Sequence, residues 1–241
     1  MPLLPIMIRL DGNSFHTFTK GLPRPYDKRL SDLMVSTASY LVDLTNAKLG
    51  YTQSDEISLI IFNEDPLYGG RTFKLISHLA SKASVYFNKQ LSTYIPEKAY
   101  LSPTFDCRAW NVPTKMEAFN TIYWRELDCI KNSISMSASY YYSHKELINK
   151  NSNQKQEMLF QKEINWNNYP SFFKHGTYVQ RKELNIPFTK QELNLLPPKH
   201  QAHKDSNLII KRHKIEILDI PGINKIPDPI SFIFDNLTPQ T

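Results

Sequence analysis

Residues 5–12 read PIMIRLDG, and this stretch decides how the fold begins. Its side chains alternate between two faces, which is the period-2 pattern of a β-strand. The two faces carry Ile6, Ile8 and Leu10, and Met7, Arg9 and Asp11, respectively. Gly12 then permits a sharp turn, because glycine has no side chain to restrict its backbone. The pattern predicts a strand that ends at a carboxylate.

Helical and strand patterns alternate after this first strand. Apolar residues recur every three or four positions from Asp27 to Asn46, and again after Gly69, which predicts two helices. The face predicted to be buried in the second helix consists of Phe73, Ile76, Leu79, Ala80, Ala83 and Phe87. Further strands are predicted at residues 48–53, 57–63 and 105–112. A capping-box spacing at residues 114–117 starts a long helix that reaches about residue 142. The order β-α-β-β-α-β predicts an α+β, polymerase-palm-like (ferredoxin-like) antiparallel sheet with helices packed on one face.

We expect two regions in one compact unit. Residues 1–143 are interpreted as the palm-like core and residues 144–241 as an α+β C-terminal extension packed on it. The segment 199–214 contains five Lys or Arg residues, three His and one acidic residue. It is interpreted as a basic loop that contacts RNA phosphate, or as ordinary solvated surface. The candidate RNA-binding residues are Lys199, Lys204, Lys211, Arg212 and Lys214.

Composition excludes several classes of protein. The chain has 241 residues, 41% of them hydrophobic, and a formal net charge of +6. This apolar content supports a packed core, and no stretch approaches the roughly 20 apolar residues that a membrane span requires. The N-terminus lacks the pattern of a signal peptide, and two cysteines without a Cys-x-x-Cys pair fit a reducing compartment, so a cytoplasmic protein is expected. The positive charge favours an anionic partner only weakly.

Three carboxylates are the best candidates for chemistry. Asp11 ends the first strand, and Asp55 and Glu56 lie at the tip of the predicted hairpin beside it. Such a cluster repels itself without cations, and hard ions such as Mg²⁺ prefer these oxygen ligands. Two such ions can activate a hydroxyl and stabilise a leaving pyrophosphate. The alternative is an ordinary Asp-Gly turn and solvated loop charges.

The sequence has no glycine-rich phosphate loop of either common type. Phosphates would therefore have to be held by metal and by basic side chains. The candidates are Arg9, Arg24, Arg71, Lys74 and Arg108. For each of them the alternative is a solvated surface charge, and Arg108 could instead pair with its neighbour Asp106.

Four motifs occur together in an order and spacing that resemble those of the tRNA-His guanylyltransferase family. They are RLDGNSF (residues 9–15), QSDE (53–56), FDCR (105–108) and YWRELD (123–128). The resemblance extends over about residues 5–185. Family members dedicated to tRNA-His carry His-Ile-Asn-Asn in the long helix, where this chain has CIKN at residues 129–132. The chain is therefore more similar to the guanylyltransferase-like branch, which is implied to repair 5′-truncated tRNAs by templated 3′-to-5′ addition.

The resemblance implies a role for each matched residue. Asp11, the Gly12 carbonyl and Asp55 would hold two Mg²⁺, supported by Glu56. Ser54 and Arg24 would contact the activating ATP, and Asn132 a nucleotide. The triphosphate of GTP or another NTP, or the RNA 5′ end, would contact Arg9, Arg71, Lys74 and Arg108. A homotetramer is also implied.

Three other functions remain open from the sequence. The first is a true tRNA-His guanylyltransferase that adds a single G. The second is a non-catalytic RNA-binding protein on a palm scaffold, and the third is a nucleotide cyclase.

Overall fold

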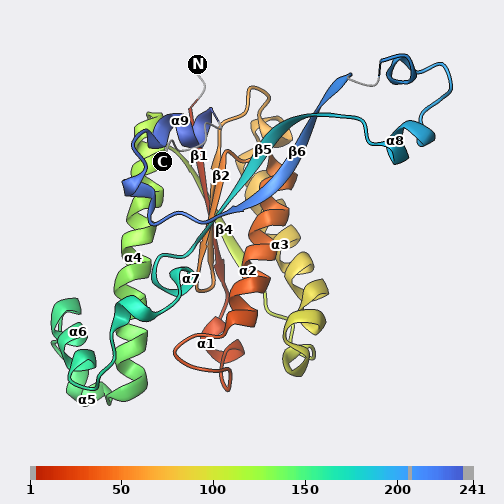
Figure 1. Cartoon of the computed structure of the whole chain (residues 1–241). Helices are drawn as coiled ribbons and strands as arrows, with labels where there is room; N and C mark the ends of the chain where they lie inside the picture. The colour runs from red at the N-terminus through yellow and green to blue at the C-terminus, as the bar shows by residue number, and fades with distance from the viewer. Residues whose placement is uncertain (1–3, 206–207, 236–241) are drawn as a thin grey trace.

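A six-stranded antiparallel sheet forms the centre of the computed structural model, which describes residues 4–205 and 208–235 (Figure 1). The strand order is β4-β1-β3-β2-β5-β6. The strands are β1 (Ile6–Gly12), β2 (Leu49–Gln53), β3 (Glu56–Ile61), β4 (Phe105–Asn111), β5 (Thr177–Pro187) and β6 (Ile209–Leu218). The first four strands in the order β4-β1-β3-β2 confirm the predicted ferredoxin-like, palm-like sheet.

Helices α2 (Lys28–Thr45) and α3 (Thr72–Tyr94) pack on one face of the sheet. Asp27 caps α2 as predicted, because its side chain accepts a hydrogen bond from the Arg29 N–H at 2.9 Å. The stripe predicted for α3 is wrong at its start, since Phe73 is 86% exposed and the buried residues begin at Leu75. The buried face of α3 therefore begins two residues later than the apolar pattern indicates.

The long helix α4 (Lys115–Tyr141) lies on the opposite face of the sheet. Thr114 caps it by accepting a hydrogen bond from the Glu117 N–H at 3.1 Å. Its buried residues Ala118 and Ile122 join a second core cluster with residues of β1, β2 and α9 (Pro229–Phe234). The two helices inside the β-α-β-β-α-β unit thus cover one face, and α4 covers the other. The carboxylate of Asp11 points to the α4 side, because it alternates with Leu10 of the first core.

The C-terminal region continues the same sheet. Tyr178 of β5 pairs with Tyr51 of β2, and β6 extends β5 on its far side. The β5–β6 ribbon runs beyond the sheet as an arm that carries α8 (Lys190–Leu195) (Figure 1). Among the described residues, no helix is both long and apolar enough to cross a membrane.

Short elements complete the described chain. The short α-helices are α1 (Phe15–Phe18), α5 (His144–Leu147), α6 (Ser152–Phe160) and α7 (Ser171–Lys174). The 3₁₀ turns are η1 (Leu67–Gly70), η2 (Pro96–Lys98), η3 (Trp166–Asn168), η4 (Gln201–His203) and η5 (Ile223–Lys225).

Candidate active site

The sheet register brings the predicted carboxylates to one end of the sheet. Asp11 of β1 is directly opposite Glu56 of β3 and Asp106 of β4. Asp55 lies in the tight turn between β2 and β3, next to Ser54 in the left-handed conformation. The Gly12 N–H donates a hydrogen bond to the Asp55 carbonyl at 3.1 Å, which ties the end of β1 to the hairpin tip. The convergence of distant carboxylates therefore follows from strand pairing alone.

Arginines already occupy part of this acidic group. Arg9 Nη2 lies 2.9 Å from Asp11 Oδ2, and Arg9 Nε lies 3.3 Å from Glu56 Oε2. Arg125 of α4 donates from Nε to Glu56 Oε1 at 2.7 Å and from Nη2 to Glu56 Oε2. Burial of the guanidinium lowers the pKa of Arg125. The hydrogen bonds and charge of Glu56 outweigh this effect, so the pKa of Arg125 is raised. Glu56 is thus a buried, doubly paired carboxylate.

Asp55 is in a different electrostatic state. Burial raises the pKa of Asp55, and the nearby charges of Asp11 and Glu56 raise it further, against hydrogen bonds from its own backbone and Ser54. It has no ion pair within the described residues. Burial and like charges destabilise the ionised form of Asp55, and a bound cation would stabilise it.

The donor set at this strand end fits a hard divalent cation. Carboxylate oxygens of Asp11 and Asp55 and the Gly12 carbonyl are ligands that Mg²⁺ accepts, usually together with water and phosphate oxygens. Within residues 4–205 and 208–235, no three or more His, Cys, Asp or Glu side chains form a group that could hold a metal ion. A metal here would therefore depend on non-protein ligands for most of its coordination.

Packing gives a second reason for glycine at position 12. A Cβ atom built there would lie 2.3 Å from the ring of Phe15, which is buried in the first core. That separation is far below van der Waals contact, so any larger residue must displace the ring. Glycine at position 12 is thus required by the packing of the core as well as by the predicted turn.

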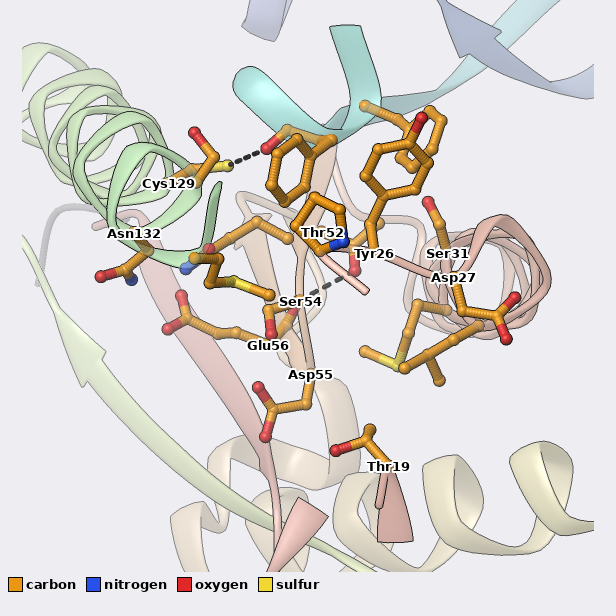
Figure 2. A pocket seen from close by; sticks show the side chains of 18 of the residues that line it. Thr19, Tyr26, Asp27, Ser31, Thr52, Ser54, Asp55, Glu56, Cys129 and Asn132 are labelled. Atoms are coloured by element: carbon orange, nitrogen blue, oxygen red, sulfur yellow. Dashed lines mark hydrogen bonds between the residues drawn. The ribbon is translucent and has the colours of Figure 1, made fainter. Parts of the chain in front are cut away.

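A pocket of about 710 Å³ opens from the carboxylates (Figure 2). This volume is within the range of roughly 300–1,000 Å³ typical of small-molecule sites. Asn132 and Cys129 of α4 face it from one side, and Tyr26, Asp27 and Ser31 from the other (Figure 2). The predicted site residues that line it are Arg9, Asp11, Arg24, Ser54, Asp55, Glu56 and Asn132.

Aromatic side chains form an apolar part of the pocket lining. Tyr26 packs against Phe172 and Phe173 of α7, with ring centroids 5.2 and 4.8 Å apart. Rings of this kind can stack on a nucleobase. The sequence reasoning missed these residues, because α7 is a single short turn with no periodic pattern.

The sequence reasoning predicted Asn132 on α4 but missed Arg125 and Asp128, which lie on the same face of the helix. Arg125, Asp128 and Asn132 all line the pocket, and Arg125 lies 3.1 Å from Asp128. Asn132 Nδ2 donates to Asp128 Oδ2 at 3.4 Å. The spacing i, i+3, i+7 places these residues on one side of a helix, and this signal could have found them.

Two predicted phosphate ligands lie away from the pocket. Arg71 and Lys74 are at the start of α3, which follows the end of β3 at Ile61. Ile61 pairs with Ile6, at the opposite end of β1 from Asp11. Arg71 donates to the Tyr68 carbonyl at 3.1 Å, and Lys74 lies over the Tyr68 ring. Arg71 and Lys74 therefore lie outside the pocket of this chain, and their contact with the triphosphate or the RNA 5′ end stays a prediction.

Arg108 lies outside the pocket but beside it. It is 63% exposed on the edge strand β4, directly opposite Arg9. Its Nη2 is 3.8 Å from Asp106 Oδ2, so the alternative Arg–Asp pair is present but loose. Arg108 is thus an exposed cation beside Arg9 that an anionic phosphate could contact.

The five predicted RNA-binding residues are all in the arm, and none lines the pocket. Lys211 is 3.7 Å from Glu183, and Arg212 pairs with Glu192. Lys199, Lys204 and Lys214 have no ion pair among the described residues. The arm therefore offers three cations that are available to a partner.

Of the two residues that depart from the family motif, Cys129 is buried and Lys131 is exposed. Cys129 lies under α7, and its Sγ donates to the Phe173 carbonyl at 3.8 Å. Burial raises the pKa of the Cys129 thiol to about 12, so the side chain stays neutral. The altered motif thus changes both the packing under α7 and the outer surface of α4.

A palm-like sheet whose acidic strand end opens into a nucleotide-sized pocket is the arrangement of an enzyme that transfers nucleotidyl groups. Comparisons with known proteins agree with this class. Residues 1–113 match the family model described as tRNAHis guanylyltransferase, and residues 106–220 match its C-terminal domain.

Relatives with sequence and structural similarity define the family further. The tRNA(His) guanylyltransferase of Neurospora crassa is 34% identical over 77% of this chain and 70% of its own. A bacterial guanylyltransferase-like protein in complex with ATP is 38% identical, with a TM-score of 0.69 over 76% of this chain and 80% of its own. A second bacterial guanylyltransferase-like protein, in complex with GTP, is 30% identical, with a TM-score of 0.65 over 90% of this chain and 84% of its own. The chain belongs to the tRNA-His guanylyltransferase family and is a nucleotidyltransferase.

Proposed function

We propose that this protein adds nucleotides to the 5′ end of tRNA in the 3′-to-5′ direction, templated by the opposite strand, and so repairs 5′-truncated tRNAs. One observation carries the proposal. A single pocket joins the carboxylates Asp11 and Asp55 to Arg24, Ser54 and Asn132, which come from separate segments of the chain. The relatives in complex with ATP and GTP support nucleotide binding by this protein.

The proposed reaction has two phosphoryl transfers. An oxygen of the RNA 5′-monophosphate attacks the α-phosphorus of ATP, and pyrophosphate leaves. The 3′-hydroxyl of an incoming NTP then attacks the activated 5′-phosphorus, its proton passes to solvent, and AMP leaves. An RNA 5′-triphosphate needs only the second transfer and releases pyrophosphate. Such reactions depend on positioning and charge neutralisation more than on a covalent nucleophile.

The side chains at the strand end supply that positioning. Two Mg²⁺, held by Asp11, Asp55 and the Gly12 carbonyl, would supply charge neutralisation at the reacting phosphates. Arg24 and Ser54 would orient the activating nucleotide in the pocket, and Asn132 would contact it from α4. Arg9 and Arg108 lie directly opposite each other on β1 and β4 and would contact the RNA 5′ phosphate or the incoming triphosphate.

The two candidate activities, templated repair and addition of a single G, differ in the nucleotides that they add. The names of the fungal relatives, tRNA(His) guanylyltransferases, favour a second candidate function, which is the addition of a single G to tRNA-His. Cys129 and Lys131 stand where dedicated enzymes carry His and Asn, and this difference favours repair. We further propose that the protein is a homotetramer, as the family resemblance implies, and that it acts in the cytoplasm.

The experiment compares two substrates with purified protein, ATP, GTP, the other NTPs and Mg²⁺. One substrate is a non-His tRNA that lacks its first 5′ nucleotide, and the other is full-length tRNA-His. Repair of the truncated tRNA at a rate equal to or above G addition supports the proposal. Addition to tRNA-His alone supports the second candidate. Salt-dependent binding of tRNA without incorporation would instead indicate a non-catalytic RNA-binding protein.

A further inference from the structure

The carboxylate of Glu56 is fully engaged by protein groups. Arg125 holds both of its oxygens from α4, with Nε 2.7 Å from Oε1. Arg9 approaches Oε2 at 3.3 Å, and the Ser58 hydroxyl donates to Oε1 at 3.2 Å. The side chain is 6% exposed. Two hydrogen bonds from Arg125 and one from Ser58, together with the nearby charge of Arg9, leave the Glu56 carboxylate few lone pairs for a cation.

Arg125 is the part of this arrangement that is not required by strand pairing. Glu56, Arg9 and Asp11 are neighbours through the register of β1 and β3, whereas Arg125 reaches them from a helix on the sheet face. Its Nη2 also lies 3.1 Å from Asp128, which contacts the amide of Asn132. Ion pairs and hydrogen bonds therefore run without a break from the pocket wall on α4 to Asp11.

We propose that Arg125 is a positioning residue that withholds Glu56 from the metal ions and uses it to orient Arg9 and Asp11. This inference rests on the proposed function, because it assigns roles within the same site. Glu56 is then an anchor for two arginines and not a metal ligand. Asp55, which has no ion pair among the described residues, keeps its carboxylate available.

The first test measures Mn²⁺ binding to the purified protein by electron paramagnetic resonance, without RNA or turnover. Arg125→Gln frees Glu56 to bind the metal, so the Mn²⁺ affinity rises by about fivefold or more. The double variant Arg125→Gln/Glu56→Gln removes both charges, and its affinity stays within about threefold of wild type. Asp55→Asn loses a direct ligand, and its affinity falls at least about tenfold.

The second measurement is the rate of nucleotide addition by the same proteins. Arg125→Gln lowers kcat about tenfold or more, because Arg9 and Asp11 lose their anchor. Metal affinity and turnover thus change in opposite directions, which a variant that merely folds poorly does not do. Arg181→Gln is the matched control. Arg181 is also a partly buried arginine beside an acid, 3.5 Å from Asp43, and both of its readouts stay at wild-type values.

Two results would overturn the inference. One is an Mn²⁺ affinity that is unchanged or lower in Arg125→Gln. The other is a double variant that loses as much affinity as Asp55→Asn, which would make Glu56 a direct ligand. If wild type binds Mn²⁺ with these variant effects but adds no nucleotide, the proposed function fails and the assignment of Arg125 to Glu56 stands.

Discussion

The buried carboxylate of Glu126, on the helix α4 that lines the pocket, gives the sharpest prediction about stability. Glu126 is 2% exposed on α4. Its Oε2 accepts hydrogen bonds from the Tyr178 hydroxyl at 2.9 Å and the Ile223 N–H at 3.0 Å, and its Oε1 lies 3.3 Å from His175 Nδ1. Burial and the charge of Glu126 raise the pKa of Tyr178, so the phenol remains a donor. One side chain thus joins α4, β5 and the segment before α9.

The magnitude follows from what each substitution leaves behind. Glu126→Ala leaves a buried hydroxyl and a buried N–H without their acceptor, each worth about 1–3 kcal/mol. The free energy of unfolding should therefore fall by about 3–5 kcal/mol. Tyr178→Phe removes one donor and leaves the other contacts, so it should cost only about 1–2 kcal/mol.

Urea unfolding followed by tryptophan fluorescence measures both losses. With an m-value of about 2–3 kcal/mol per molar, Glu126→Ala lowers the midpoint by about 1–2 M. Glu183→Gln removes an exposed carboxylate 3.7 Å from Lys211 and should change the free energy of unfolding by less than about 0.5 kcal/mol. A loss below about 1 kcal/mol in Glu126→Ala would refute the reasoning that this carboxylate holds the three segments together.

Three further predictions use the same physical arguments. Gly12→Ala should cost about 1–3 kcal/mol of stability by displacing the ring of Phe15, and Phe15→Leu in that background should recover part of the loss in urea unfolding. Because burial and the charges of Asp11 and Glu56 raise the pKa of Asp55, its ionised form opposes folding. Asp55→Asn should therefore be more stable than wild type at pH 7 without Mg²⁺, and this gain should shrink as the pH falls through the raised pKa. Replacing Lys199, Lys204 and Lys214 with Gln should reduce the salt slope of tRNA binding by up to about three while leaving ATP affinity unchanged; an unaltered slope would place RNA elsewhere.

The fold was largely readable from local patterns. The alternation in residues 5–12, the Asp27 cap and the hairpin around Asp55 each determine one element, and their order restricts the topology. The buried face of α3 was predicted incorrectly at its first residue, because Phe73 belongs to the apolar pattern but is exposed. Nothing in the period of residues 115–141 indicates which side of the sheet the helix covers.

The part of the candidate site that depends on strand pairing could be predicted from the sequence. The part that depends on the packing of helices could not. Asp11 and Glu56 meet because β1 and β3 pair. Arg125 reaches Glu56 only because α4 crosses the other face, and Phe173 lines the pocket only because α7 packs beside Tyr26. Arg71 was assigned by its matched position in the family resemblance, and a matched position alone does not place a residue at the pocket of the same chain.

Extension of a truncated tRNA tests the central claim most directly. Purified wild type and Asp55→Ala are each incubated with a non-His tRNA that lacks its first 5′ nucleotide, ATP, the NTP complementary to the template base, and Mg²⁺. We predict that wild type restores the missing nucleotide, that a non-complementary NTP is not added, and that Asp55→Ala yields no product above background. Equal product from wild type and Asp55→Ala, or addition that ignores the template base, would contradict this account.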